Sequence, residues 1–264
     1  MDSAELIDLW LASIARDKGL SENTVLAYAR TMRTVPDPLH ADREDIENWA
    51  RSRSEMSIST RNSELSIVRT FYKWCAKWEH REDDPTARIE VPKIPKGLPH
   101  PISRAELHRL LTAVGDEDRR AVCLGAYGGL RVSEAASLMW ADIDTEFNRV
   151  RIKGKGGKER LIGLSPLLMD EIAPEVVGGN VVTGTTKVYS AGTLQRRLNR
   201  AIHDAGIDNT FHALRHRYAT VALATTGNVL AVSRALGHSS PATTAIYAAA
   251  SDADLDVIAD AVCR

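Results

Sequence analysis

The chain has 264 residues, a formal net charge of −1, and 44 % hydrophobic residues. That length suits one large domain or two ordinary ones, and the composition is that of a folded globular protein. It has no apolar run of about 18 residues and no signal-peptide pattern at its N-terminus, so we expect a cytoplasmic protein without membrane spans. The three cysteines are widely scattered, which is typical of reduced thiols rather than disulfides.

The first 92 residues predict a bundle of four helices. Apolar residues recur at helical spacing from residue 6, and helix-capping residues stand at Ser21 and Asp42. The fourth helix is predicted over about 59–78. Its apolar stripe consists of Leu65, Val68, Phe71, Tyr72 and Cys75. Its other face carries the cations Arg61, Arg69, Lys73 and Lys77. Four short amphipathic helices of this kind form a compact bundle.

Residues 93–101 predict a linker between two domains. Prolines recur through this stretch, which also holds Lys93 and Lys96 and shows no helical or strand period. The linker separates a first domain, 1–92, from a second, 102–264.

The second domain predicts a mixture of helices with a small β-hairpin. A capping box at Ser103 to Glu106 starts its first helix. Further helices are predicted at about 117–127, 131–139, 165–173, 191–205, 211–226 and 228–236, then from Ser240–Pro241, and finally over 252–263. Alternation over 149–153 and 158–163, with glycines between, predicts the hairpin, and we expect one more strand within 178–188. The fold class is therefore mainly α, with an N-terminal bundle and a mixed α+β second domain.

The hairpin is strongly basic. Between residues 149 and 160 a single Glu159 stands against six cations, namely Arg149, Arg151, Lys153, Lys155, Lys158 and Arg160. Such a run is either a solvated strand edge or a surface for a polyanion. Its glycine-rich turn is not a phosphate loop, because it lacks the motif's spacing and precedes a strand rather than a helix. The near-neutral net charge argues mildly against a nucleic-acid partner, although clustering can override it.

Residues that could carry chemistry gather late in the chain. Arg131 stands at a predicted helix start with Glu134 three residues on, where a surface ion pair is the simplest interpretation. His212 and His216 have the spacing of zinc-binding helix pairs, but Arg215 between them would repel a cation. We therefore expect no metal and no cofactor. Arginine forks suit phosphate oxygens, and a tyrosine nucleophile needs neighbouring charge and a base.

Five motifs in order make the chain resemble the tyrosine recombinase (phage integrase and Xer-like) family. They are Gly129-Leu130-Arg131-Val132-Ser133-Glu134, the hairpin Lys155, His212-Ala213-Leu214-Arg215-His216, Leu236-Gly237-His238-Ser239, and Tyr247 nine residues after His238. The N-terminal bundle resembles the family's core-binding domain in Ser21-Glu22-Asn23-Thr24 and Arg81-Glu82-Asp83-Asp84-Pro85. The resemblance covers almost the whole chain.

The resemblance implies a site-specific DNA recombinase that forms a 3′-phosphotyrosyl bond and proceeds through a Holliday junction. It makes Tyr247 the nucleophile and Lys155 the acid for the leaving 5′-oxygen, with His212 as acid/base near the tyrosine. Arg131, Arg215 and His238 would hold the phosphate, with Glu134 and His216 in support. Neither ATP nor a metal is required.

The implied partners are double-stranded DNA and further copies of the chain. We expect a monomer when free and a tetramer on synapsed DNA. The helix at 252–263 is expected to dock on a neighbour or to fold back on its own domain. An accessory factor that sets directionality is a further candidate partner. Expected DNA contacts are Arg61, Arg69, Lys73, Lys77, Lys93, Lys96, Arg104, Lys153 and Lys158.

The bundle begins almost at residue 3, which predicts a minimal phage or mobile-element integrase without an arm-binding domain. Alternatives are an Xer-type dimer resolvase, a type IB topoisomerase, and a non-catalytic DNA-binding protein.

Overall fold

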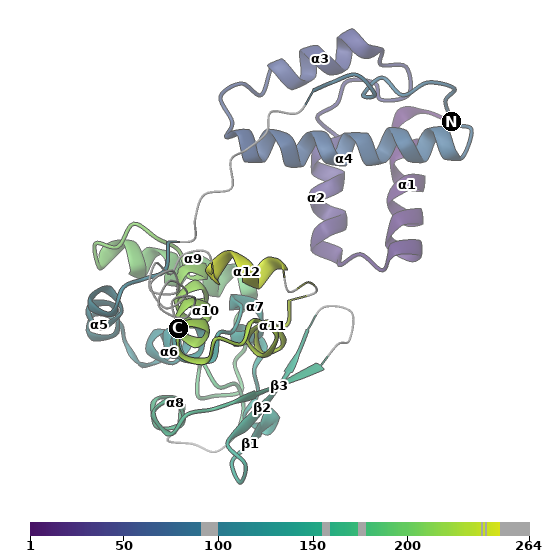
Figure 1. Cartoon of the computed structure of the whole chain (residues 1–264). Coiled ribbons are helices and arrows are strands. Elements are labelled where there is room, and N and C mark those ends of the chain that lie inside the picture. Colours follow the sequence, from purple (N-terminus) through teal and green to yellow (C-terminus); the bar gives the residue numbers. More distant parts are fainter. Residues whose placement is uncertain (91–99, 155–158, 174–177, 239, 241, 249–264) are drawn as a thin grey trace, which may run out of the picture. The chain divides into compact units, whose positions relative to one another are not determined.

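The computed structural model describes the chain except for residues 91–99, 155–158, 174–177, 239, 241 and 249–264 (Figure 1). The predictions for Lys93, Lys96, Lys155, Lys158, Pro241 and the 252–263 helix fall outside the described residues. The chain divides into two compact units, Met1–Lys96 and Gly97–Arg264. No helix in the described part of the chain is long and apolar enough to cross a membrane.

The N-terminal unit holds the four predicted helices. They are α1 (Ser3–Lys18), α2 (Glu22–Met32), α3 (Arg43–Arg51) and α4 (Ile58–Lys77). Each begins after a side-chain cap, and the predicted caps at Ser21 and Asp42 are confirmed. Helices α1, α2 and α4 pack against one another (Figure 1).

Aromatic rings fill the core of this unit. Trp10 stacks on Tyr28 at 5.6 Å between ring centroids and meets Phe71 edge-on at 5.3 Å. The whole predicted stripe of α4 is buried, so the periodicity of the sequence identified this face correctly.

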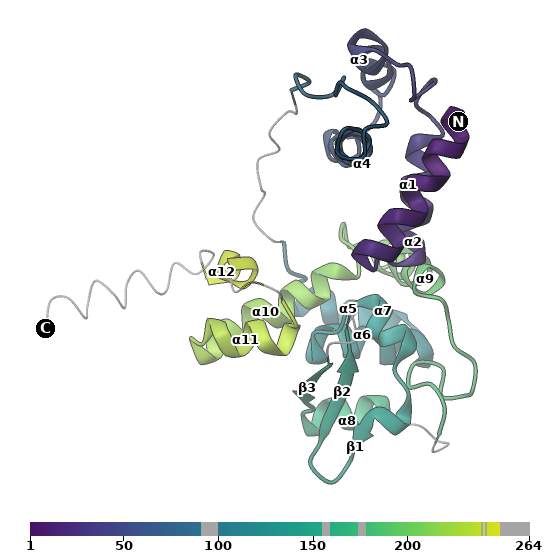
Figure 2. The same cartoon turned by 90° about the vertical axis from the view of Figure 1, so that its right-hand side faces the viewer.

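The C-terminal unit is a helical domain with a three-stranded sheet. Its helices are α5 (Arg104–Ala113), α6 (Asp116–Gly128), α7 (Val132–Ser137), η1 (Trp140–Asp142), α8 (Pro166–Ile172), α9 (Ala191–Asp204), α10 (His212–Thr226), α11 (Val229–Leu236) and α12 (Ala242–Ala248). Helices α10, α11 and α12 form one packed group (Figure 2). The fold class is as predicted.

The predicted hairpin is confirmed. Strands β2 (Arg149–Lys153) and β3 (Glu159–Gly163) pair antiparallel, and the short β1 (Ile143–Asp144), which the sequence did not reveal, pairs with β2. Val150, Ile152 and Ile162 face the core.

The strand expected within 178–188 is wrong. Asn180 makes only an isolated bridge to Met139, and the segment turns instead. The buried amide of Asn180 donates to the carbonyls of Ala136 and Leu138, at 2.8 and 3.1 Å, and accepts from the backbone N–H groups of Val182 and Thr183, at 3.0 and 3.2 Å. These side-chain bonds satisfy backbone groups that a strand ladder would otherwise use.

Candidate active site

The first arginine motif forms the junction between α6 and α7. Gly129 ends α6 with φ of 65°, and a Cβ there would lie 2.6 Å from the ring of Tyr218, so only glycine fits. Arg131 is the N-cap of α7, and its backbone N–H donates to Glu134 Oε2 at 2.8 Å. The turn therefore aims both side chains into the same space.

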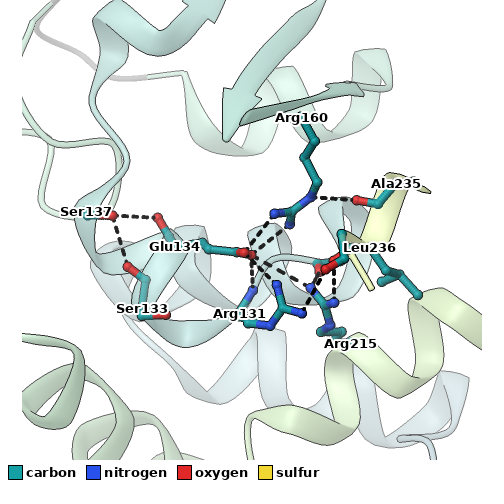
Figure 3. A network of polar contacts seen from close by, with 10 residues as sticks. Arg131, Ser133, Glu134, Ser137, Arg160, Arg215, Ala235 and Leu236 are labelled. Atoms are coloured by element: carbon teal, nitrogen blue, oxygen red, sulfur yellow. Dashed lines mark hydrogen bonds and ion pairs between the residues drawn. The ribbon is translucent and has the colours of Figure 1, made fainter. Parts of the chain in front are cut away.

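Glu134 is the centre of a cluster of three arginines (Figure 3). Its carboxylate accepts from both Nη atoms of Arg160 and from Nη1 of Arg131, each at 2.8 Å. Arg215 Nη1 lies 3.7 Å from Oε2. Burial acts to raise the pKa of Glu134, but the bonds from Arg160 and Arg131 outweigh it and hold the pKa at about 2. Glu134 is 7 % exposed, so this is a buried ion cluster rather than the surface pair that the spacing suggested.

Arg215 is almost enclosed, whereas Arg131 is open to solvent. Arg215 is 2 % exposed, and its guanidinium donates to the carbonyls of Gly129 and Leu236. Burial and the charge of Arg131 lower the pKa of Arg215 to about 10, which leaves it charged at neutral pH. The Arg131 side chain is 38 % exposed and its Nη2 donates to the carbonyl of Gly237 at 3.3 Å. Arg131 is thus the arginine that can meet an incoming anion.

The hydroxyl of Tyr247 is hydrogen-bonded to Nδ1 of His216. Burial raises the pKa of Tyr247 while the charge of Arg215 opposes that rise. Burial, His212 and Arg215 lower the pKa of His216 to about 4, so its ring is neutral and Nδ1 can accept a hydrogen bond from the hydroxyl. The His212 ring meets that of His216 edge-on at 4.5 Å. His216, rather than the expected His212, therefore contacts the hydroxyl.

Tyr247 itself lies on α12 and is 5 % exposed. Its ring packs in a small apolar cluster with Ala219, Leu223, Val232 and Leu236. The ring of Tyr247 is therefore held by apolar packing as well as by the bond of its hydroxyl to His216.

His238 follows α11 and is held by a residue that the sequence did not single out. Its Nδ1 lies 2.8 Å from Oγ1 of Thr244, which is fully buried. Burial and the charge of Arg215 lower the pKa of His238 to about 4, so this ring is also neutral.

Part of this cluster borders an open pocket of about 1060 Å³. Its lining includes Arg131, Glu134, Lys153, Arg160 and His238, whereas His216 and Tyr247 lie outside it. Lys153 is exposed and lies 3.5 Å from Asp142. The pocket can take an anion at the open face of Arg131.

The structure separates the expected DNA contacts into two groups. Lys73, Lys77 and Arg104 are exposed. Arg69 instead donates to the carbonyl of Ile89, and Arg61 is half-buried on the wall of a second pocket of about 510 Å³. That pocket also includes arginines that the sequence did not single out, namely Arg43, Arg51, Arg53 and Arg88.

The sequence missed Arg160 as a site residue, because it stood in a run of six cations. Strand alternation was the available signal. Arg160 shares parity with the inward-facing Ile162, which places it on the buried face of the hairpin.

No group of three or more His, Cys, Asp or Glu residues within the described ranges is arranged to hold a metal ion. His216, one of the two histidines with zinc-binding spacing, is hydrogen-bonded through Nδ1 to the hydroxyl of Tyr247.

Comparison with protein families decides the relationship. The description "Phage integrase family" matches residues 101–254, and "Phage integrase, N-terminal SAM-like domain" matches residues 7–80. The chain belongs to the phage integrase family. The family resemblance that the motifs indicated is thereby confirmed.

Relatives cover both units of the chain. The tyrosine recombinase XerD of Shewanella oneidensis is 30 % identical over 272 residues, which cover 92 % of this chain and 91 % of the relative. XerC of Xanthomonas campestris pv. campestris is 27 % identical over 266 residues, covering 91 % and 83 %.

Two lambda integrase structures share the fold. A dimer bound to a COC′ core site aligns with a TM-score of 0.75 and 20 % identity over 91 % of this chain and 96 % of that one. A tetramer bound to a Holliday junction aligns with a TM-score of 0.74 and 18 % identity over 91 % and 78 %.

Proposed function

We propose that the chain is a site-specific DNA recombinase that cuts and rejoins strands through a covalent bond to Tyr247. The observation that carries the proposal is the Tyr247 hydroxyl, hydrogen-bonded to a neutral histidine beside a cluster of arginines. Family membership and the tyrosine recombinase relatives support it.

The first step is attack of the Tyr247 oxygen on the scissile phosphorus. The tyrosine proton passes to Nδ1 of His216, a P–O bond forms to the tyrosine, and the bond to the 5′-oxygen of DNA breaks. A phosphodiester carries one negative charge and gains a second in the five-coordinate transition state, which preorganised arginines stabilise. Arg131 supplies the more exposed guanidinium, Arg215 adds positive charge, and His238 donates a hydrogen bond from its Nε2–H.

The leaving 5′-oxygen needs a proton, and Lys155 remains our prediction for the acid. His212 lies edge-on against His216 and helps to keep that ring neutral. In the second step the 5′-hydroxyl of a partner strand attacks the phosphotyrosine, which restores Tyr247 and joins the strands. Because the covalent bond conserves the phosphodiester, the reaction balances without ATP.

Duplex DNA and further copies of the chain are the proposed partners. The lambda integrase structures on a core site and on a Holliday junction share this fold, which supports an assembly on DNA. Exposed Lys73 and Lys77 of α4 and Arg104 of α5 are proposed phosphate contacts. Such contacts position a duplex without reading its sequence.

Covalent trapping on a mixture of duplexes tests the proposal, because it selects the target sequence and detects the bond together. Nicked duplexes with a randomised central segment are incubated with the protein, and DNA that migrates with protein in SDS is sequenced. We expect trapped DNA with wild type and none with Tyr247→Phe, which should still shift the selected duplexes in a native gel. An adduct that persists in Tyr247→Phe would remove the nucleophile assignment, and binding without an adduct in wild type would favour a non-catalytic DNA-binding protein.

Two biological roles fit this chemistry. We favour integration or excision of a phage or mobile element, and similarity to XerD and XerC also supports resolution of chromosome or plasmid dimers. Selected sites placed as direct repeats on one plasmid test resolution, and the same sites on two plasmids test integration. Adding host extract to either reaction tests for a directionality factor.

A further inference from the structure

Arg160 occupies an unusual place for a charged residue. Strand register pairs it with Ile152, and both Ile152 and its neighbour on the same face, Ile162, are buried. Leu161, which lies between Arg160 and Ile162 in β3 and faces the other way, is 59 % exposed. The Arg160 side chain is only 11 % exposed. A guanidinium on the core side of a hairpin persists only if its charge and donors are compensated.

The compensation comes from two segments of the active site (Figure 3). Nη1 and Nη2 each donate to a different oxygen of Glu134 at 2.8 Å, and Nε donates to the carbonyl of Ala235 at 2.8 Å. A Cβ on Gly237 would lie 3.0 Å from Cδ of Arg160, so the turn before His238 packs directly on this side chain. Arg160 therefore joins β3 to α7 and to the end of α11.

We propose that Arg160 is a positioning residue for strand cleavage, which fixes Glu134 as a platform for Arg131 and fixes the turn that carries His238. This inference rests on the proposed recombinase function. Arg160 is not a phosphate ligand here, because its side chain is only 11 % exposed and Nε, Nη1 and Nη2 all donate to protein acceptors. Arg131 shares the same carboxylate, but its side chain is 38 % exposed and its Nη2 makes only a longer bond, of 3.3 Å, to the carbonyl of Gly237.

Charge balance explains why a third arginine is useful. One carboxylate lies among three guanidinium groups, so the cluster retains two positive charges. That excess matches the double negative charge of the transition state. Without Arg160 the freed lone pairs of Glu134 would draw Arg131 and Arg215 toward the carboxylate and away from the phosphate.

The matched control is a second arginine in the same unit with the same pattern of contacts. Arg119 donates to both oxygens of Glu171, at 2.6 and 2.7 Å, and to the carbonyl of Leu111 at 2.9 Å. These residues are not among those that border the pocket beside Arg131. Arg119→Met therefore removes an equivalent set of bonds away from the chemistry.

The test compares Arg160→Met, Arg160→Lys and Arg119→Met on trapped duplexes. We expect Arg160→Met to slow adduct formation at saturating protein on the order of 10²-fold, as misplaced catalytic groups do, with little change in Kd. Arg160→Lys restores part of the rate, because lysine keeps the charge but cannot span both oxygens. Arg119→Met leaves the rate unchanged. In a Glu134→Gln background, Arg160→Met slows the reaction less than it does in wild type, because only the contacts with the turn before His238 are then lost.

Equal rates for Arg160→Met and wild type, or equal losses for Arg160→Met and Arg119→Met, would overturn the inference. Loss of the adduct in wild type as well would instead count against the recombinase proposal. A measurement without DNA tests the role of Arg160 independently of the recombinase proposal. The Glu134 carboxyl carbon, assigned with Glu134→Gln, is titrated by NMR with Arg131 and Arg215 in place. We expect its titration to move to higher pH in Arg160→Met, and an unmoved titration would show that Arg160 does not act through Glu134.

Discussion

The two units differ in how their largest buried polar side chains are partnered. In the N-terminal unit the core is aromatic, and the buried Nε1 of Trp10 and hydroxyl of Tyr72 have no partner among the described residues. In the C-terminal unit Glu134, Arg215 and Asn180 are buried and each is hydrogen-bonded. Apolar burial is non-directional, whereas a satisfied polar network fixes the orientation of each group. The unit with buried, partnered charges is the one that can hold a phosphate in a set geometry.

Among the substitutions that test this difference between the units, Arg131→Lys should slow adduct formation most. Lysine keeps the charge but loses the planar fork shared between Glu134 and an incoming phosphate. We expect adduct formation to fall by about 10²- to 10³-fold, the range for removal of one transition-state donor, with Kd nearly unchanged. Single-turnover gels on trapped duplexes measure both. Lys73→Arg in the N-terminal unit is the control and should leave the rate alone. A rate for Arg131→Lys close to wild type would mean that the phosphate is held elsewhere.

Asn180→Leu and Tyr72→Phe test the buried polar groups directly. Asn180→Leu leaves buried carbonyl and N–H groups unpaired, and we expect a loss of about 3 kcal/mol or more in the free energy of unfolding. Tyr72→Phe removes a hydroxyl without a partner, so we expect a neutral effect or a gain of up to about 1 kcal/mol. Urea denaturation measures each change. Equal losses from both would contradict the contrast between the units.

Most of the fold follows from local sequence patterns. The α4 stripe and the caps at Ser21 and Asp42 depend on neighbours within a few residues, which the sequence shows directly. The turn at 178–188 depends on Asn180 reaching Ala136 and Leu138, more than forty residues earlier, which no local pattern reveals.

The site shows the same limit. Motif spacing identified Arg131, Arg215, His238 and Tyr247 as candidates, and the structure brings their elements together around α10, α11 and the start of α7. Glu134 was expected in a surface ion pair, because helical spacing predicts which residues share a face of the helix but not how deeply that face is buried. Tyr247 and His216 lie on two different helices and are thirty-one residues apart in the sequence. The choice between His212 and His216 therefore required the packed structure.

Exposed cations in the N-terminal unit should affect binding and not chemistry. Lys73 and Lys77 lie on the solvent face of α4, and Lys77 rests over the ring of Trp78 at 5.5 Å. We expect Lys73→Ala with Lys77→Ala to raise Kd and to make the salt dependence of binding shallower, by about one unit of slope for each phosphate that the protein no longer neutralises. The adduct rate at saturation should stay at the wild-type value. An unchanged salt slope would remove this face of α4 from the DNA-binding surface.

The smallest expected effect is the contribution of His216 to acid sensitivity. The unfolded chain binds a proton at this histidine near pH 6.5, whereas the folded protein holds its pKa at about 4. Protons therefore bind the unfolded state first, so this site lowers stability as pH falls from about 6.5 toward 4. His216→Gln keeps an acceptor for Tyr247 without titrating. We expect it to lose less stability than wild type between pH 7 and pH 4.5, by about 1 kcal/mol after solvent screening of a half-buried ring.

Thermal or urea unfolding at the two pH values measures the difference, with Tyr247→Phe as the control. Burial is the main cause of the low pKa of His216, followed by the charges of His212 and Arg215, and none of these is removed with the hydroxyl. Tyr247→Phe should therefore keep the acid sensitivity of wild type while losing the adduct. If His216→Gln and wild type lost stability in parallel, the pKa of His216 in the folded protein would lie near its unfolded value, and burial against His212 and Arg215 would not lower it.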